Sequence, residues 1–565
     1  MTRLRNICFM LILIFAGSCA TMVPPKGGPR DTEPPVVEET SPPNESVNLQ
    51  PQQIRIRFNE FVQLNDVQNQ VLISPPVKDK PVFQLKGKSL VFDLPEKLKE
   101  NTTYNIFFGS AVQDLNEGNP MNNLSYTFST GPYLDSLFLS GHAKNALSGE
   151  TEKGWLIMLY REHGDSLPYK KVPFYITKTD EHGYFRFENL APGSYKIFGI
   201  KDENSNYLYD PYDEAISFSD TLIQPFEPVQ LPDSLLKDSL LADTVNLDSL
   251  RYKTAQKGVH LSFFKEIDTV QSITDKKALN PFVYQYVFRY PTKKIQVRSN
   301  PKVSFHQSLN STKDTLKLFF EKAVDDSLQF YFSDTGFAWS DTIWTEPKKT
   351  KEKKTYSIQS NLKHGLLPYF KKASFQAPIP FQTIHDSLII VKEKQDSLFK
   401  SISGTVYFQD TVLKNIVLAD FEFNADYQYR LTALPGAMIL ADSSTHDTLS
   451  FDFEIKGKEK YGNIIFELLS PDSSMAYIIQ LLDNNQEVVK QQHINGNQEV
   501  KFEHLNPNTY GIRVIEDNIP NGVWDTGIYS EGRHPERSWI FHKQLNVRAN
   551  WDISERMDLT ELHSH

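Results

Sequence analysis

The chain has only two cysteines among its 565 residues. Cys8 lies in an apolar run close to the N-terminus, and Cys19 follows that run. If the run is removed on maturation, Cys19 is left alone, which excludes a core held by disulfides. The fold must then depend on buried apolar surface, and the length predicts four or five domains.

Positive charge is also scarce. Lysine and arginine number 60 against 70 acidic residues, so the formal net charge is −10. This balance argues against nucleic acid as a partner, because nucleic acid binding needs a concentrated basic surface. The sequence also lacks the G-x-S-x-G, H-E-x-x-H, P-loop and dinucleotide-binding signatures. We therefore predict that the protein is not an enzyme, although two carboxylates of a cryptic hydrolase could lie far apart in sequence.

Glycine (26) and long Ala/Leu/Glu stretches are few, whereas phenylalanine (38) and tyrosine (25) are abundant. This composition favours β-structure, and the 39% of apolar residues is enough to build cores. Short alternating segments such as QIRIRF at 53–58 and SLVFDL at 89–94 are separated by turn residues. The predicted fold class is all-β, with a string of small β-sandwich domains behind an N-terminal leader.

The leader is the most specific signal in the sequence. Arg3 and Arg5 precede an apolar run at 7–15, and Ala-Gly-Ser comes immediately before Cys19. This is typical of a secretory signal peptide at 1–18, and the run is too short to span a bilayer. The small residues before Cys19 resemble a bacterial lipobox, which implies a lipid on that cysteine. An ordinary signal peptide with an incidental cysteine is the alternative.

The Pro/Gly-rich residues 19–32 are expected to be a tether to the membrane. Beyond it, GGPRDTEPPVV, KLKENTTYNIFF and LNEGNPMNNLSYTFSTG resemble the bacterial Ig-like domains at the head of Bacteroidetes-type lipoproteins. This resemblance covers residues 33–131.

A second resemblance begins with FRFENLAPGSYKIFGI. Its strand–turn–strand pattern is similar to carboxypeptidase regulatory-like (transthyretin-like) domains, which are small sandwiches without catalytic residues; we assign it to 135–229. Adding 315 to nine of its residue numbers reaches the same or a similar residue, which predicts a duplicated module at 457–552. The nine positions are Phe187, Leu190, Pro192, Tyr195, Ile197, Ile200, Asp202, Asn206 and Asp210.

A shift of 325 relates Tyr104, Leu124, Tyr126 and Phe128 to similar residues, which predicts a second Ig-like domain at 376–456. The remaining segments are a middle β-domain at 256–375 and a tail at 553–565. An Asp-Ser/Thr-rich linker is expected at 230–255, where aspartate recurs every five residues and fits neither a strand nor a helix face.

The tripeptide Asp-Ser/Thr-aliphatic recurs along the chain and resembles the O-glycosylation acceptor of Bacteroidetes-type envelopes. At most positions an aspartate that ends a turn before a strand explains it equally well. No strand follows the tripeptide in the linker, so we predict glycosylation there. The candidate residues are Ser234, Ser239, Thr244 and Ser249.

The loop IKDENSNYLYD offers oxygen ligands at spacings close to those of an EF-hand. The candidate calcium ligands are Asp202, Asn204, Asn206, Asp210 and Asp213. Position six of the loop is Tyr207, where a glycine is usual; the second copy has Gly522 there but isoleucine at 519 and 528. The loop resembles the calcium loops of bacterial surface B-type repeats in part. A polar turn is the alternative, and no other cofactor is expected.

Together these features predict a non-catalytic outer-membrane lipoprotein that acts as a binding or scaffold subunit of an envelope complex, such as an outer-membrane barrel complex. One alternative is a carbohydrate- or surface-binding adhesin that uses Trp524, Trp539 or Trp551 as sugar platforms; a cryptic hydrolase or hydrolase accessory is another. The neutral residues 20–23, ahead of Lys26, favour the periplasmic face, because surface-exported lipoproteins of this type carry acidic residues after the cysteine.

Overall fold

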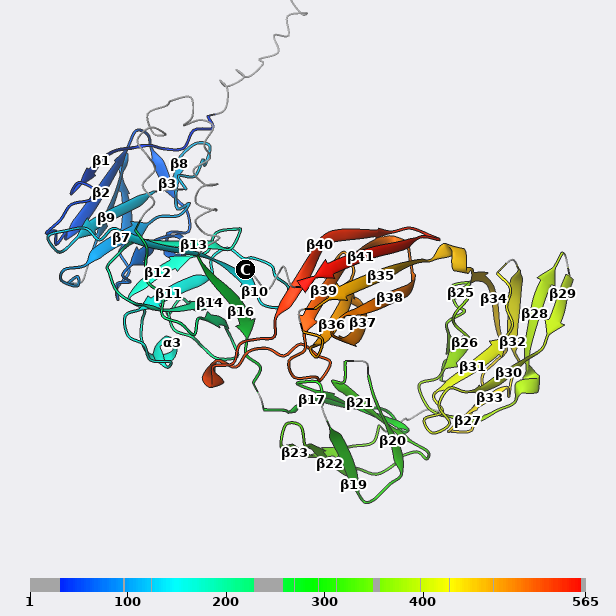
Figure 1. Cartoon of the computed structure of the whole chain (residues 1–565). Coiled ribbons are helices and arrows are strands. Elements are labelled where there is room, and N and C mark those ends of the chain that lie inside the picture. The colour runs from blue at the N-terminus through cyan, green and yellow to red at the C-terminus, as the bar shows by residue number, and fades with distance from the viewer. Residues whose placement is uncertain are drawn as a thin grey trace, which may run out of the picture. The chain divides into compact units, whose positions relative to one another are not determined.

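A computed structural model describes residues 31–559 except 95–96, 123, 228–257, 269, 293, 311, 349–355, 397, 426 and 471. The described chain is almost entirely β-structure (Figure 1), as the sequence predicts. Its α-helices have four residues each, and among the described residues no helix has the length and apolar character needed to cross a membrane. The chain divides into two compact units: residues up to 263 without 145–149, and residues 145–149 together with 264 onward.

Domain 1 packs the sheets β1-β2-β6-β5 and β4-β7-β9, with the small pair β3-β8, around one core. Strand β2 alternates exposed and buried side chains, as its sequence QIRIRF predicts. The elements are β1 (Val37–Ser41), β2 (Gln53–Phe58), β3 (Val62–Leu64), α2 (Val67–Gln70), β4 (Leu72–Ser74), β5 (Phe83–Lys86), β6 (Ser89–Asp93), β7 (Thr103–Phe107), β8 (Val112–Asp114) and β9 (Ser125–Ser129).

Domain 2 is a single sheet in the order β12-β11-β14-β15-β16-β10-β13 that curls around one core. The elements are β10 (Leu137–Asn145), β11 (Leu156–Tyr160), α3 (Leu167–Lys170), β12 (Tyr175–Lys178), β13 (Tyr184–Leu190), β14 (Lys196–Ile200), β15 (Ala215–Phe218) and β16 (Val259–Lys265). The sequence placed β16 in the middle β-domain. It instead fills the gap between β15 and β10, because Leu261 and Phe263 are buried in the domain 2 core.

Domain 3 packs the sheets β17-β18-β21-β20 and β19-β22-β23 over a core rich in phenylalanine and tyrosine. The strands are β17 (Ile273–Asn280), β18 (Val283–Phe288), β19 (Ile295–Asn300), β20 (Phe305–Leu309), β21 (Thr315–Phe320), β22 (Leu328–Asp334) and β23 (Trp339–Thr345).

Domain 4 packs the sheets β24-β26-β31-β30 and β25-β34-β32-β28-β29. It begins before residue 376, the predicted start, because β24 to β26 pair within these sheets. The elements are β24 (Gln359–Ser360), β25 (Leu366–Pro368), β26 (Ala373–Gln376), β27 (Phe381–Ile384), η1 (Asp386–Leu388), β28 (Ile389–Gln395), β29 (Leu398–Ile402), β30 (Gly404–Phe408), β31 (Ile416–Phe421), β32 (Gln428–Ala433), β33 (Met438–Leu440) and β34 (Leu449–Lys456).

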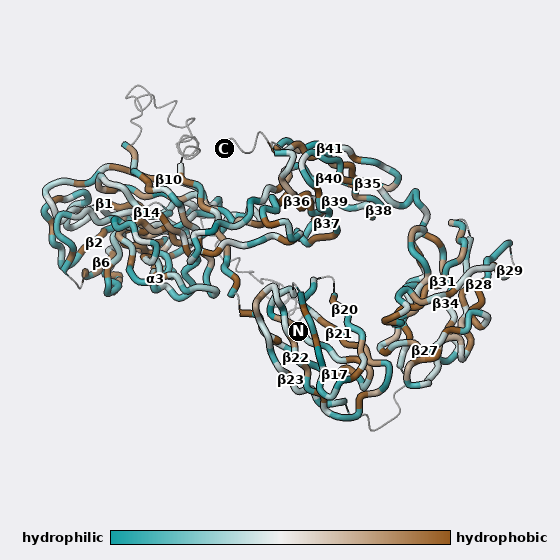
Figure 2. Tube along the Cα trace, turned by 60° about the horizontal axis from the view of Figure 1, so that its bottom comes forward, coloured by the Kyte–Doolittle hydropathy of each residue, from teal (hydrophilic) through white to brown (hydrophobic). Residues whose placement is uncertain are grey.

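Domain 5 packs the sheets β38-β35-β41 and β37-β36-β39-β40. The predicted tail at 553–565 contributes β41, which pairs with β35 because Met557 and Leu559 are buried in the core. The elements are η2 (Lys458–Lys460), β35 (Gly462–Leu469), β36 (Ala476–Leu482), β37 (Val488–Asn495), β38 (Gln498–Leu505), β39 (Asn508–Glu516), η3 (Tyr529–Glu531), β40 (Ser538–Val547) and β41 (Asp552–Asp558). Figure 2 shows polar and apolar stretches alternating along the tube, as expected for strands with one buried face.

The 315-residue shift relates domains 2 and 5 in detail. The Tyr195 hydroxyl donates to the Ala191 carbonyl at 2.7 Å, and the Tyr510 hydroxyl donates to the Asn506 carbonyl at 2.9 Å. In domain 2 the register of the β10–β13 pair shifts between the partners of Phe187 and Leu190. In domain 5 the register of the β35–β38 pair shifts at the same point, between the partners of Phe502 and Leu505. The strand order therefore repeats along with the sequence, although the strands form one sheet in domain 2 and two sheets in domain 5.

The weaker 325-residue shift relates a detail of domains 1 and 4. The Tyr104 hydroxyl accepts the Lys99 backbone N–H at 2.9 Å, and the Tyr429 hydroxyl accepts that of Asn424 at 2.7 Å. Each tyrosine also stacks on the phenylalanine opposite it in the next strand, with ring centroids 5.5 and 5.6 Å apart. The two domains share this corner, where a buried tyrosine closes the start of a strand.

Candidate functional site

Two loops follow equivalent strands of domains 2 and 5. The first loop, residues 202–214, leaves β14, and the second loop, residues 517–536, leaves β39. A fully buried isoleucine fixes where each loop starts: Ile200 is the last residue of β14, and Ile515 is the last but one of β39. The polar side chains of each loop therefore begin from a rigid base.

In the first loop, Asp202 organises the backbone. Its two carboxylate oxygens accept the backbone N–H groups of Asn206 and Tyr207, both at 3.1 Å. The Asn204 side-chain oxygen accepts the Asn206 N–H at 3.0 Å, and the Asn206 side-chain oxygen accepts the Leu208 N–H at 2.6 Å. These contacts are turns in which Asx side chains replace backbone acceptors.

Asp210 completes this arrangement. Its carboxylate accepts the side-chain amides of Asn204 at 2.6 Å and Asn206 at 3.4 Å. Asp213, the fifth predicted ligand, is exposed. The next residue, Glu214, is 2% exposed, and its carboxylate accepts the backbone N–H groups of Glu203 at 2.9 Å and Asp210 at 3.1 Å. The structure thus joins four of the five predicted residues and adds Glu214.

The second loop repeats the pattern. Asp517 accepts the backbone N–H groups of Asn521 at 3.3 Å and Gly522 at 3.1 Å, and the Asn521 amide donates to Asp525 at 2.6 Å. The buried Glu536 carboxylate accepts the backbone N–H groups of Ile519 at 3.2 Å and Asp525 at 2.9 Å. Both loops are therefore shaped by a first aspartate, an asparagine, a second aspartate and a buried glutamate.

Burial raises the pKa of the Glu214 carboxyl, and the nearby Asp202 and Asp210 carboxylates raise it further. Burial likewise raises the pKa of Glu536, together with Asp525 and Asp517. In each loop the two backbone N–H bonds oppose this rise. Each loop therefore concentrates negative charge around one buried carboxyl.

Side-chain oxygens of both loops already accept hydrogen bonds from the loop itself. Within the part of the chain that the structure describes, no group of three or more His, Cys, Asp or Glu side chains is placed to hold a metal. The polar turn accounts for the loop geometry without an ion, and calcium binding by the first loop stays a prediction.

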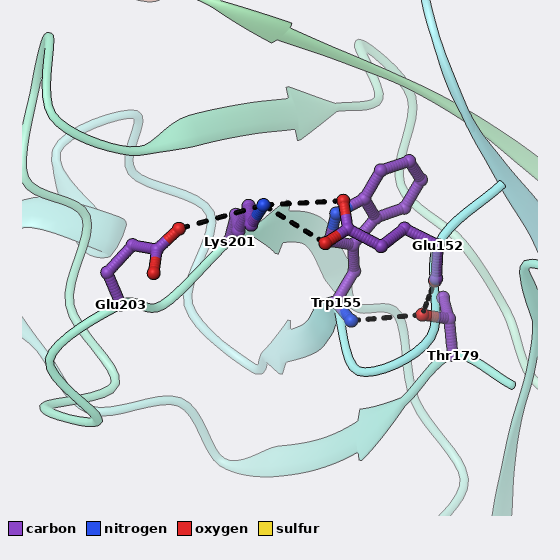
Figure 3. A network of polar contacts seen from close by, with 5 residues as sticks. All are labelled: Glu152, Trp155, Thr179, Lys201 and Glu203. Atoms are coloured by element: carbon purple, nitrogen blue, oxygen red, sulfur yellow. Dashed lines mark hydrogen bonds and ion pairs between the residues drawn. The ribbon is translucent and has the colours of Figure 1, made fainter. Parts of the chain in front are cut away.

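The start of the first loop is held by an ion pair (Figure 3). The Lys201 ammonium lies 3.0 Å from the Glu152 carboxylate and 3.7 Å from that of Glu203. The hydrogen bond to Glu152 is the main reason that the pKa of Lys201 is raised. The Thr179 hydroxyl donates to the Glu152 carbonyl at 2.7 Å and accepts the Trp155 backbone N–H at 3.0 Å. The network joins the loop to the turn before β11.

Position six is where the two loops differ. Tyr207 has a φ of 62° and Gly522 a φ of 77°, so both are in the left-handed region. That conformation costs a residue with a side chain about 1–2 kcal/mol. Tyr207 lines a cavity of about 300 Å³ together with residues of domain 1 that include parts of α2 and β5. The Lys80 ammonium lies 6.0 Å from the centroid of the Tyr207 ring. The sequence marked Tyr207 only as a departure from a calcium loop; the structure shows a contact with the neighbouring domain.

Other bonds also join domains 1 and 2, which belong to one compact unit. The Ile176 N–H donates to the Ser74 hydroxyl at 3.1 Å, and the Lys178 ammonium donates to the Asn69 carbonyl at 2.8 Å. Burial lowers the pKa of Lys178, and Lys80 lowers it further. The loop and the edge of β12 thus face the same part of domain 1.

A second cluster lies where the chain passes from domain 1 to domain 2. The buried Asp135 carboxylate accepts the Thr103 hydroxyl at 2.9 Å, and the Asp135 carbonyl accepts the Asn189 amide at 3.1 Å. Two cations lie close to the Phe174 ring: the Arg161 guanidinium is 3.8 Å and the Lys99 ammonium 4.5 Å from its centroid. Polar and cation–π contacts together fix the first two domains.

The predicted lipidation site Cys19 lies outside the described residues, as do the glycosylation candidates Ser234, Ser239, Thr244 and Ser249. The described residues on either side place the predicted linker inside domain 2, between β15 and β16. In domain 5 the equivalent strands β40 and β41 are joined by residues 548–551. The Asp-Ser/Thr-rich segment is therefore an insertion within domain 2.

The three tryptophans proposed as sugar platforms have different surroundings. The Trp524 indole N–H donates to the Glu536 carbonyl at 3.0 Å. Trp539 is half-buried and packs against the domain 5 core. Trp551 is 58% exposed, with the Arg548 guanidinium 5.3 Å from the ring. Of the three, only Trp551 offers a largely open ring.

Comparison with known proteins identifies the first domain. Residues 31–130 match the family model described as a bacterial Ig-like domain. No curated protein matches the chain. Architectures of Ig-like domains are typically non-catalytic and suggest a binding or scaffold role.

Several solved structures also align along the chain. They include the S-layer protein SbsC (10% identity, TM-score 0.13, 91% of this chain and 67% of that one) and the Bacillus anthracis TIE protein (8%, 0.14, 94% and 76%). A third is the Down syndrome cell adhesion molecule with eight N-terminal Ig domains (7%, 0.12, 90% and 69%). At these TM-scores the alignments do not define an arrangement of domains.

Proposed function

We propose that this protein is a non-catalytic outer-membrane lipoprotein of Bacteroidetes type that serves as a binding or scaffold subunit of an envelope complex. In this proposal Cys19 carries the lipid, domains 2 and 5 are transthyretin-like modules, and the partner is an outer-membrane barrel complex reached from the periplasmic face. The leader sequence, the Ig-like domain at 31–130 and the repeated β-sandwiches support it.

The observation that carries the scaffold role is a pair of open strand edges in domain 4. Strand β29 is the last strand of its sheet, and β30 begins after one intervening residue as the last strand of the other sheet. Leu398 in β29 is 71% exposed and Tyr407 in β30 is 38% exposed. An unpaired edge with exposed apolar side chains can accept a strand from a second protein.

The test is purification of the membrane-anchored protein in mild detergent, with mass spectrometry of the proteins that remain bound. We expect a barrel protein in stoichiometric amount. We also expect Leu398→Lys to lower its recovery at least tenfold, because a charge on an edge strand opposes pairing. Val82→Lys is the matched control, since Val82 is 70% exposed in domain 1. Cys19→Ala should release the protein from the membrane.

A run in calcium chelator shows whether partner binding needs the ion. If no protein is retained in either run, or if Val82→Lys and Leu398→Lys lose the partner equally, the scaffold proposal is wrong. In the first case the carbohydrate- or surface-binding alternative takes its place.

A further inference from the structure

A groove lies where domain 4 ends and domain 5 begins, within one compact unit. Residues 457–461 connect β34 to β35, so the two domains follow each other closely. The Phe370 ring, just after β25, stacks on His504 of β38 with centroids 4.2 Å apart and packs edge-on to Tyr461 at 5.3 Å. The Lys456 ammonium donates to the Asn506 side chain at 2.5 Å. These contacts join the two domains beside the groove.

The groove has a volume of about 450 Å³, within the range of ligand pockets. Its apolar lining includes Phe370, Tyr461 and Val489. Lys371 and Lys490, together with Lys456, add ammonium groups, and no carboxylate is among the lining residues. The lining of the groove thus combines an apolar floor with positive charge.

Two of the three ammonium groups donate hydrogen bonds to uncharged oxygens, and the third belongs to an exposed side chain. Lys456 donates to an amide oxygen, Lys490 donates to the Glu503 backbone carbonyl, and Lys371 is exposed. None of the three forms an ion pair with another described residue. Burial lowers the pKa of Lys490, whereas the nearby Glu503 carboxylate raises it and the charge of Lys371 lowers it. Each ammonium has three N–H groups, so donors remain for a ligand.

His504, which stacks on Phe370, has an equivalent backbone position in domain 2. It has a φ of 58°, and its counterpart 315 residues earlier, Asn189, has a φ of 57°. In domain 2 the Asn189 amide bonds to Asp135, whereas in domain 5 the imidazole stacks on Phe370. The same left-handed backbone position therefore serves a domain contact in both copies, and only the second copy places an aromatic ring in a groove.

We infer that this groove binds a pyranose that carries a phosphate group. The C–H face of a pyranose suits the apolar floor, where Phe370 is 41% exposed. Lysine ammonium groups suit a phosphate, which they bind as point charges. A carboxylate would favour the two-pronged geometry of arginine, and no arginine lines the groove. This site is independent of the proposed scaffold role and of the edges of β29 and β30.

The test titrates the full chain with glucose 1-phosphate, glucose and inorganic phosphate, followed by calorimetry and by broadening of the ligand's phosphorus NMR signal. We expect glucose 1-phosphate to bind more tightly than either of its parts. Lys490→Gln should weaken it at least tenfold, because a charge-assisted hydrogen bond is lost. Phe370→Ala should remove the advantage over inorganic phosphate. Lys392→Gln, which removes an exposed charge of domain 4 away from the groove, should leave binding unchanged.

Circular dichroism and the melting temperature confirm that the variants are folded. The inference is wrong if glucose 1-phosphate does not bind below about 10 mM, or if it binds no more tightly than inorganic phosphate. It is also wrong if Lys490→Gln and Lys392→Gln bind the sugar phosphate as tightly as the wild type. A synthetic acidic peptide of residues 233–243 that competes better than glucose 1-phosphate would make the groove a peptide site instead.

Discussion

The two loops that follow β14 and β39 have nearly the same backbone but different residues at its most constrained point. Asp202 and Asp517 each accept two backbone N–H groups, from residues four and five positions later. The second of those residues is left-handed in both loops, yet it is Tyr207 in one and Gly522 in the other. The first aspartate therefore sets the turn, and position six can then be used for something else.

The two loops also reach their buried glutamate over different lengths of chain. Glu214 follows Asp210 by four residues, whereas Glu536 follows Asp525 by eleven and the extra residues include η3. Both carboxylates nevertheless bond to the backbone N–H of the ninth loop residue. The position of the strand that follows the glutamate, β15 or β40, therefore matters more for where the carboxyl lies than the length of the loop.

The largest effect is expected at position six. Tyr207→Ala should destabilise domain 2 by about 2–3 kcal/mol, because it removes the ring from its contact with domain 1 and leaves the left-handed strain. Tyr207→Gly should cost about 1 kcal/mol less, since glycine adopts this conformation freely. Gly522→Ala should cost domain 5 that same difference of about 1 kcal/mol. Hydrogen exchange at β14 and β39 during urea unfolding reports on each copy separately.

The stability difference between Tyr207→Ala and Tyr207→Gly should equal the difference between Gly522→Ala and the wild type. Only then are the two loop backbones equivalent. A methyl group at Gly522 would lie 2.8 Å from the His493 ring, but that side chain is exposed and can move. Equal stability of the alanine and glycine variants at position 207 would contradict the left-handed assignment there.

Calcium provides a second way to separate the loops. The first loop carries oxygen-bearing side chains at 202, 204, 206 and 210, whereas Ile519 replaces one of these in the second loop. We expect calcium at about five times its dissociation constant to stabilise domain 2 by about 1 kcal/mol and to leave domain 5 unchanged. Asp202→Asn should abolish the effect, while Asp517→Asn is the matched control. Calorimetry with calcium or chelator measures it, and an unchanged wild type would make both loops polar turns only.

Much of the fold could be predicted because equivalent residues recur at a fixed spacing in the repeated domains. Tyr195 and Tyr510 are recognisable from spacing, and their hydroxyls make the same hydrogen bond. Strand β16 could not be placed in the same way, because it reaches its sheet only after a long insertion. Local alternation shows that a segment is a strand but not which sheet it joins.

The candidate site was predicted less completely for a similar reason. Counting positions from Asp202 selected Asp213, which is exposed, whereas its neighbour Glu214, just before β15, is buried and bonds to the loop backbone. The role of Tyr207 depends on the adjoining domain, and the groove at Phe370 combines residues more than a hundred positions apart. Spacing within one segment cannot reveal contacts between separate segments.

The smallest expected effect concerns pH, and it tests whether the two glutamates are equivalent. Burial and neighbouring aspartates raise the pKa of Glu214 and Glu536 above their ordinary value of 4.5 in the folded protein. Between that value and the raised pKa the folded state binds more protons than the unfolded state, so their contribution to stability falls as pH rises through this window. Other carboxyls have lowered pKa values and act in the opposite direction, for example Asp452 beside Arg430.

The comparison must therefore be between the wild type and the variants Glu214→Gln and Glu536→Gln. Each glutamine removes one titrating group. Above pH 4.5 the melting temperature of each variant should therefore fall less steeply with pH than that of the wild type, and by the same amount in both variants. A variant that keeps the full downward slope above pH 4.5 would mean that its glutamate does not have a raised pKa when folded. A change for only one of the two would show that the loops share a backbone without sharing an electrostatic environment, because the two bonds to each carboxylate are alike.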